Sequence, residues 1–146
     1  MTVLFASAED AEDAFYEAIG RGDLEALMSV WADDDEIVCV HPTGERLCGP
    51  AAIGESWRTI FASNPDITVR VTSRIVWRGV MLDVHSVVEM LYVGGEASAH
   101  DPMQSTNVYQ RGPNGWRLLA RHTSVASTKN GEEALGERRA TRHTLH

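Results

Sequence analysis

A histidine at the end of a short apolar strand is the residue best suited to chemistry in this sequence. The strand is expected at residues 37–40 and ends in His41-Pro42, ahead of a turn and of a helix that opens at Gly49-Pro50. Strand ends beside loops are common positions for pocket residues. Because an imidazole has an unperturbed pKa of about 6.5, it accepts protons near neutral pH, and we predict His41 as a general base. The alternative is a histidine that only holds the turn through a hydrogen bond.

The last predicted strand carries two further polar candidates. Strict alternation puts five residues on one face: Trp116, Leu118, Ala120, His122 and Ser124. His122 is thereby a candidate second polar group of a pocket. Ser124 lacks the strand–turn–helix setting of a catalytic serine, so we assign it to ligand contact and not to nucleophilic attack.

His85 and Glu89 form a third candidate group. They alternate correctly on a strand predicted at residues 81–93, so they share one face and can form a charge-assisted hydrogen bond. The alternation does not decide which face of this strand points inward. Two tryptophans, Trp31 and Trp57, fall on apolar helix stripes, which favours the core or the wall of a pocket.

Three helical patterns occupy the first half of the chain. The first follows Ser7, a weak N-cap, and breaks at residues 20–22, while the second is capped by Asp23. The third begins at Pro50 and ends before Asn64, because a residue that precedes proline resists the helical conformation. Apolar residues recur at helical spacing in these segments, which predicts one buried face per helix.

The second half of the chain changes to a period of two, which is typical of strands. Alternation and turn residues predict strands at residues 67–77, 81–93, 104–110 and 116–126. Antiparallel hairpins in series give a meander that curls around the helices, an α+β layout. We therefore expect one domain at residues 1–126 and a polar, mobile tail at 127–146.

Bulk composition excludes several classes of protein. The 146 residues are 43% hydrophobic and 23% charged, as expected for a globular domain. A formal net charge of −8 argues against nucleic acid as the main partner. No apolar run approaches the roughly 20 residues that span a bilayer, and the acidic N-terminal stretch does not resemble a signal peptide. We expect a cytoplasmic protein without membrane contact.

The cysteines and histidines predict neither a disulfide nor a metal site. Cys39 and Cys48 flank the turn after His41, and we expect two buried, reduced thiols; a bridge between the paired short strands is the alternative. The six histidines are scattered, and no His/Cys cluster has the spacing of a zinc site. No metal and no cofactor is expected.

Several short segments, taken in order, carry a resemblance to a known superfamily. They lie at residues 22–24, 31–34, 41–44, 49–53, 106–109 and 115–118. With three helices before a curved meander, residues 8–126 resemble the nuclear-transport-factor-2-like superfamily, which includes SnoaL-like polyketide cyclases and ketosteroid isomerases. The resemblance implies an α+β fold: three N-terminal helices packed in the concave face of a strongly curved, mostly antiparallel sheet, a cone-shaped α+β barrel. Such a fold hosts many activities.

Ketosteroid isomerases supply a pattern for the site residues. Their carboxylate base precedes the turn where this chain has His41, and their protonated aspartic acid lies where this chain has Asn107. Their tyrosine on the first helix corresponds to Phe15, and Tyr16, rotated by about 100° on the helix, is not expected to replace it. Two roles are changed in residue type and one is lost, so steroid isomerisation itself is not expected.

The residues and the resemblance together favour a small hydrophobic-ligand pocket. The expected chemistry is cofactor-free acid–base catalysis next to a carbonyl, of the isomerase, cyclase or dehydratase type. In that scheme His41 removes a proton, and Asn107, helped by His122, stabilises the enolate. The expected ligand contacts are Phe15, Trp31, Trp57, Glu89, Leu118 and Ser124.

The rival interpretation is a non-catalytic module of the same fold that serves dimerisation or partner binding. The incomplete set of isomerase residues favours this rival, whereas a histidine at the base position favours the enzyme. In either case, apolar residues within 69–76 and 81–90 leave a second apolar face on the sheet. A monomer rarely exposes such a patch, so we predict a homodimer through the outer face of the sheet.

Overall fold

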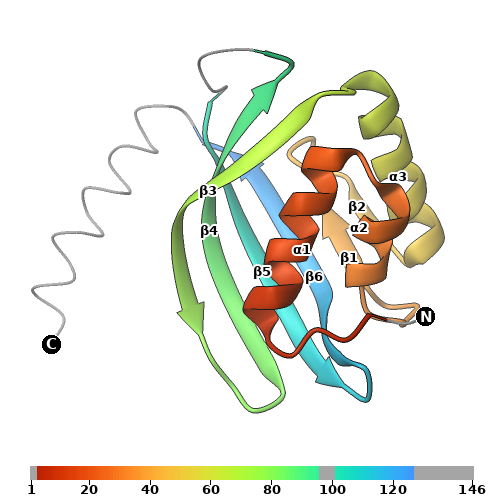
Figure 1. Cartoon of the computed structure of the whole chain (residues 1–146), viewed down its shortest axis with the longest axis vertical. Coiled ribbons are helices and arrows are strands. Elements are labelled where there is room, and N and C mark those ends of the chain that lie inside the picture. The colour runs from red at the N-terminus through yellow and green to blue at the C-terminus, as the bar shows by residue number, and fades with distance from the viewer. Residues whose placement is uncertain (1–2, 96–100, 127–146) are drawn as a thin grey trace, which may run out of the picture.

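The described part of the chain, residues 3–95 and 101–126 of a computed structural model, contains three helices and one six-stranded sheet (Figure 1). The helices are α1 (Ala8–Arg21), α2 (Leu24–Val30) and α3 (Pro50–Ser63). The strands are β1 (Val38–Val40), β2 (Arg46–Cys48), β3 (Ile67–Trp77), β4 (Leu82–Val93), β5 (Met103–Gly112) and β6 (Gly115–Val125). The tail predicted at 127–146 lies outside the described residues. None of the described helices is long and apolar enough to cross a membrane.

Local capping explains where the helices begin and end. The Ser7 side chain accepts a hydrogen bond from the Asp10 amide at 3.1 Å. Helix α1 ends at Gly22, whose φ of 62° is a left-handed conformation that glycine adopts without strain. Asp23 caps α2 through the Ala26 amide at 3.0 Å. The three predicted helices are confirmed, because each of these signals depends on residues only a few positions apart.

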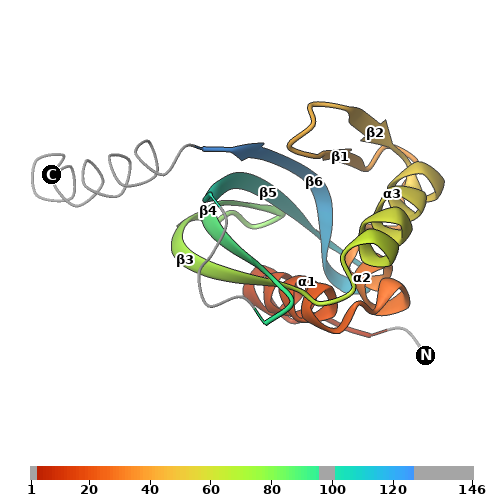
Figure 2. The ribbon, with the colours of Figure 1, turned by 90° about the horizontal axis from the view of Figure 1, so that it is seen from above.

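The strand order is β2-β1-β6-β5-β4-β3, and the sheet stays open because β2 and β3 lie at its two edges. β1 and β6 pair in parallel, while the other pairs are antiparallel. Figure 2 shows how the sheet curves around α1, with α3 beside β2. The predicted α+β fold, with three helices in the concave face of a curved, mostly antiparallel sheet, is confirmed, although the barrel is not closed.

Helix α1 is buried along two stripes because it lies between the sheet and the other helices. Phe15 and Ile19 belong to its apolar stripe, and Glu12 and Tyr16 form a neighbouring polar stripe that is also buried. The helix contacts α2 on one side and β3, β5 and β6 on the other. The expectation of a single buried face therefore fails for α1, since the curved sheet covers a second one.

A β-bulge in β6 reverses the expected alternation of that strand. Leu119 is an extra residue that has no partner on β5. Leu118 is buried before the bulge and Arg121 after it, whereas His122 and Ser124 are exposed. The prediction that His122 and Ser124 share the inner face with Leu118 is wrong for this reason.

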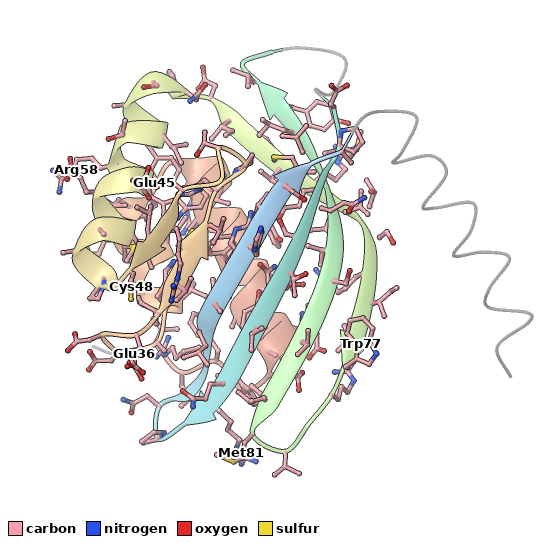
Figure 3. All side chains as sticks on the ribbon, turned by 180° about the vertical axis from the view of Figure 1, so that it is seen from behind. Glu36, Glu45, Cys48, Arg58, Trp77 and Met81 are labelled. Atoms are coloured by element: carbon pink, nitrogen blue, oxygen red, sulfur yellow. The ribbon has the colours of Figure 1, made fainter. Side chains whose placement is uncertain are left out.

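The two cysteines lie on opposite faces of the short β1–β2 hairpin. Cys39 pairs with Leu47, so Cys48 is shifted by one residue and points to the other side. Cys48 is exposed (Figure 3), Cys39 is buried, and both are free. The expectation of reduced thiols agrees with this, but the expectation that both are buried is wrong for Cys48.

Candidate functional site

His41 directly follows β1 and is partly buried against α3. Its Nε2 atom lies 2.9 Å from the Ser56 hydroxyl, and its ring packs edge-on against Trp57, with the ring centroids 5.3 Å apart. The single hydroxyl proton of Ser56 is donated to the Ile53 carbonyl oxygen at 2.8 Å, so Nε2 is the donor toward Ser56. This tautomer leaves the imidazole lone pair on Nδ1, which a general base requires.

The surroundings of His41 favour its neutral form. Burial lowers the pKa of the imidazole below its ordinary value, and the positive charge of Arg121 lowers it further, against a smaller opposite effect of Glu45. Cys39 Sγ lies 3.8 Å from His41 Nε2, and burial raises the pKa of this thiol to about 11. A thiol that stays protonated is a poor nucleophile, so the pair supports a histidine base and not cysteine catalysis.

Asn107, the predicted oxyanion donor, lies fully buried in a separate polar network. Its Nδ2 atom donates to Glu12 Oε2 at 3.1 Å and to the Tyr16 hydroxyl at 3.0 Å. Its Oδ1 atom accepts from Arg121 Nη1 at 3.0 Å. Both amide protons are therefore engaged, which leaves Asn107 no free donor for an enolate in this arrangement.

Arg121 and Glu89 form the charged centre of this buried network. The guanidinium binds the carboxylate with both of its terminal nitrogens, at 2.8 Å and 3.0 Å, and the Tyr16 hydroxyl donates to Glu89 Oε2. Burial alone would lower the pKa of Arg121, but the charge of Glu89 raises it overall, and burial raises the pKa of Tyr16. Arg121 is therefore charged and the Tyr16 phenol is protonated. Tyr16 thus reaches Asn107, contrary to the expectation from its helix position, because α1 is buried along both stripes.

Glu12 is the second charged centre. Its Oε2 atom accepts from the Tyr109 hydroxyl at 2.7 Å and lies 3.0 Å from His85 Nδ1, and its Oε1 atom lies 2.8 Å from Arg74 Nε. Burial would raise the pKa of Glu12, but hydrogen bonds from His85, Tyr109 and Asn107 and the charge of His85 lower it overall. For His85, burial lowers the pKa, while Glu12 and other nearby carboxylates raise it overall.

The predicted pairing of His85 with Glu89 is therefore only half right. Both side chains share the inner face of β4, as the alternation predicts. However, His85 pairs with Glu12 and Glu89 pairs with Arg121. Residues four apart on a strand are separated by roughly 13 Å, too far for a direct hydrogen bond. Helix α1 supplies Glu12 as the partner of His85, and β6 supplies Arg121 as the partner of Glu89.

Strand register assembles this network from distant parts of the sequence. His85 is the cross-strand partner of Asn107, Asn107 of Arg121, and Arg121 of Cys39, so one row crosses β4, β5, β6 and β1. Sequence reasoning missed the role of Arg121 because alternating polar residues favour the solvent face of a sheet. A local signal existed on α1, where a polar stripe at i, i+4 spacing runs beside the apolar one.

Comparison with known proteins decides the family. Residues 8–128 match the domain described as SnoaL-like. The chain belongs to the SnoaL-like family. Among solved structures it resembles a candidate calcium/calmodulin-dependent protein kinase type II association domain from Thiobacillus denitrificans, with 35% identity, 85% of this chain and 98% of that chain covered, and a TM-score of 0.76. A candidate dehydratase of the NTF2-like family from Streptomyces avermitilis is 30% identical, with 80% and 91% covered and a TM-score of 0.71.

One curated relative belongs to a different kind of protein. The F-box protein SKIP8 of Arabidopsis thaliana is 24% identical over 111 residues, which are 76% of this chain and 46% of that protein. The SnoaL-like chain therefore spans about half the length of the curated relative it matches. The resemblance to the NTF2-like superfamily is confirmed, and because one fold serves such different proteins, the activity does not follow from it.

In this SnoaL-like domain the predicted apolar contacts gather around Phe15. Its ring packs edge-on against Trp57 and Trp31, with centroids 5.7 Å and 6.5 Å away, and Leu118 belongs to the same buried cluster. The indole N–H groups of both tryptophans are buried and make no hydrogen bond within the described residues. Phe15, Trp31 and Trp57 are called the aromatic wall below, and Trp57 is its member that contacts His41.

The SnoaL-like domain brings only some of the predicted residues together. His122 and Ser124 point away from His41, and Glu89 belongs to the buried network. Two surface hollows of about 250 Å³ and 230 Å³ lie beside the β5–β6 turn, and no predicted site residue lines either of them. The site that remains consists of His41, with Ser56 behind it and the aromatic wall beside it.

Proposed function

We propose that this SnoaL-like protein binds a small hydrophobic carbonyl compound beside His41 and that His41 acts on it as a cofactor-free general base. The observation that carries this proposal is the pair of contacts that the Ser56 hydroxyl makes, with His41 Nε2 and with the Ile53 carbonyl oxygen. The Nε2–H of His41 is held by Ser56, whose own proton is used by the Ile53 carbonyl, so the basic lone pair lies on Nδ1. The pKa of the imidazole is lowered by burial, which keeps the base unprotonated at neutral pH.

The chemistry proposed is removal of a proton next to the carbonyl, as in an isomerase, cyclase or dehydratase. The resemblance to a candidate dehydratase at 30% identity supports a reaction of this class. Trp57, whose ring packs against His41, is the apolar side chain nearest to the base, and Phe15 and Trp31 pack behind it in the core. Asn107 does not stabilise the enolate in this proposal, because both of its amide protons are engaged by Glu12 and Tyr16.

A ligand screen tests this proposal directly. Hydrophobic ketones and aldehydes are screened for an increase in melting temperature, since a ligand that binds only the folded protein must stabilise it. His41→Ala should abolish or weaken the shift, whereas the matched variant His122→Ala should leave it unchanged, because His122 is exposed on the outer face. The proposal fails if no carbonyl compound binds, or if His41→Ala binds and turns over a ligand as well as the original protein.

A second candidate function is assembly through the outer face of the sheet. Ile75, Trp77, Val84 and Val88 alternate with inward residues, and Trp77 is 56% exposed near the β3–β4 turn (Figure 3). The Thiobacillus structure at 35% identity is described as an association domain. An apolar outer face of this kind suits an isologous contact with a second copy of the chain.

Light scattering tests the assembly. At micromolar concentration we expect a mass of twice the 16.1 kDa chain. Trp77→Glu should return the protein to a monomer, whereas the same change at Leu4, an exposed apolar residue outside this face, should not. A mass near 16.1 kDa for the unmodified protein would contradict the proposed homodimer.

A further inference from the structure

Three side chains with metal-binding donor atoms lie close together where the start of α1 meets the start of β4, a place separate from His41. Glu9, Asp83 and His85 each offer one ligand atom, and these atoms lie within 4.8 Å of one another. His85 Nε2 is 3.5 Å from Asp83 Oδ2 and 3.9 Å from Glu9 Oε1. We propose that these three residues bind a divalent transition-metal ion such as Zn²⁺ or Mn²⁺.

The unsatisfied ring nitrogens of His85 are the independent reason to expect a ligand. The side chain has no exposed surface, and neither nitrogen makes a hydrogen bond of acceptable geometry within the described residues. Nδ1 lies near Glu12, and Nε2 faces the carboxylates of Asp83 and Glu9. A buried polar atom without a partner requires an explanation, and an absent ion is one. The two neighbouring carboxylates provide the negative charge that would hold a cation there.

Metal-binding histidines usually have a carboxylate or carbonyl group beside their second ring nitrogen, and His85 has one. Its Nδ1 atom lies 3.0 Å from Glu12 Oε2, and Tyr109 and Asn107 hold that carboxylate in place. With the ring proton on Nδ1, toward that carboxylate, the Nε2 lone pair is available to the metal. The Asp83 carboxylate is oriented in a similar way, because Oδ1 accepts the Gly79 amide at 3.0 Å and Oδ2 remains for the ion.

The distances are close to those of an occupied site. Bonds of about 2.0 to 2.2 Å from one ion place two of its ligand atoms about 3.0 to 3.4 Å apart. The observed separations of 3.5 Å and 3.9 Å need only small side-chain movements to reach that range. Three protein ligands also leave at least one coordination position for water or another small ligand.

The donor set indicates the class of ion. One imidazole nitrogen with two carboxylate oxygens suits Zn²⁺, Mn²⁺ or Fe²⁺ better than Mg²⁺ or Ca²⁺, which prefer oxygen ligands alone. Arg78 is the competitor, because it forms an ion pair with Glu9. The Arg78 side chain is 67% exposed, so it can turn into solvent when an ion takes its place.

The sequence hides this site because Glu9 lies far from Asp83 and His85 along the chain, so no short motif unites them. It is also separate from the proposed catalytic base, which lies at the end of β1. The test of the metal proposal is therefore independent of the test of the carbonyl chemistry at His41.

Titration calorimetry on the metal-free, tag-free full chain tests the proposal. We expect one Zn²⁺ per chain, weaker binding of Mn²⁺ and no measurable binding of Mg²⁺ under the same conditions. In NMR spectra Zn²⁺ should shift the ring signals of His85 and leave those of His41 unchanged. Absence of Zn²⁺ binding, or a shift at other histidines with none at His85, would overturn the proposal.

Matched variants identify the ligands. Glu9→Gln and Asp83→Asn should each weaken Zn²⁺ binding by about tenfold or more, while Glu17→Gln, an exposed residue of the same helix, should not change it. Arg78→Gln should strengthen binding because it removes the competing cation. Glu9 is partly exposed, so Glu9→Gln is expected to fold even if Asp83→Asn does not. Unchanged affinity in Glu9→Gln would place the ion elsewhere and contradict this site.

Discussion

Two polar regions inside the same curved sheet differ in how completely their groups are paired. Around Arg121 and Glu89 the charges are neutralised by each other, and the neighbouring hydroxyl and amide groups complete the contacts. Around His41 the Ser56 hydroxyl and the Cys39 thiol both lie at Nε2, and no hydrogen bond within the described residues engages Nδ1. Buried, fully paired groups specify the packing of a core, whereas a partly exposed group with a free lone pair can react.

The comparison also separates the two residues that the sequence predicts as partners in catalysis. His41 follows β1, whereas Asn107 is a fully buried bridge between two charged centres. A residue type that is chemically suited to catalysis is not enough. Its donors must also be free when the ligand arrives.

The largest expected effect comes from breaking the charge pair in the network. Arg121→Met should lower the free energy of unfolding by about 3–5 kcal/mol, because it leaves the Glu89 carboxylate buried without its partner. The double variant Arg121→Met/Glu89→Leu should recover much of that loss, since no buried charge remains unpaired. Urea denaturation measures both. A loss below about 1 kcal/mol in the single variant would show that water reaches Glu89.

At His41 the expected effect is on turnover and not on stability. With a substrate from the ligand screen, His41→Ala should reduce kcat by about 10²-fold or more while the protein keeps its fold. His41→Asp should retain more activity than His41→Ala, because a carboxylate can also accept a proton. Activity should rise with pH through one step below about pH 6.5, in line with the lowered pKa. Undiminished kcat in His41→Ala would remove this histidine from the chemistry.

Asn107→Ala separates the structural from the catalytic interpretation of the amide. We expect a loss of about 1–3 kcal/mol in the free energy of unfolding, because three partners lose a hydrogen bond. Thr106→Ala is the control. Thr106 precedes Asn107 and is exposed on the outer face of the sheet, so its substitution should cost under about 0.5 kcal/mol of unfolding free energy. A stable Asn107→Ala variant with greatly reduced turnover would show that the Asn107 amide takes part in catalysis.

The smallest expected effect is the pH dependence that His41 contributes to stability. Its folded pKa is lowered, so the unfolded chain binds the proton more readily. The contribution is therefore present above about pH 6.5 and is lost as the pH falls through the folded pKa. It should be small, since solvent screens a partly exposed group. NMR titration of the His41 ring should give a pKa below 6.5, and a higher value would contradict the neutral base.

Part of the candidate site could be predicted because it depends on local sequence. His41 lies where a strand meets a turn, and the strand, the turn and the helix at Pro50 all lie within a short stretch of chain. The shared inner face of His85 and Glu89 also follows from alternation within one strand. The position of His122 could not be predicted, because one extra residue in β6 turns the rest of the strand over.

By itself, the sequence determined the helices, the strands and the family resemblance, because capping, periodicity and turn residues act over a few positions. Only the tertiary structure decided which polar residues became buried and with which partners. The parallel pairing of β1 with β6 places Cys39 beside Arg121, and the curvature of the sheet covers Glu12 on α1. The physical reason is that a charged group is buried only where an opposite charge from another element meets it, and that meeting depends on contacts between residues far apart in the chain.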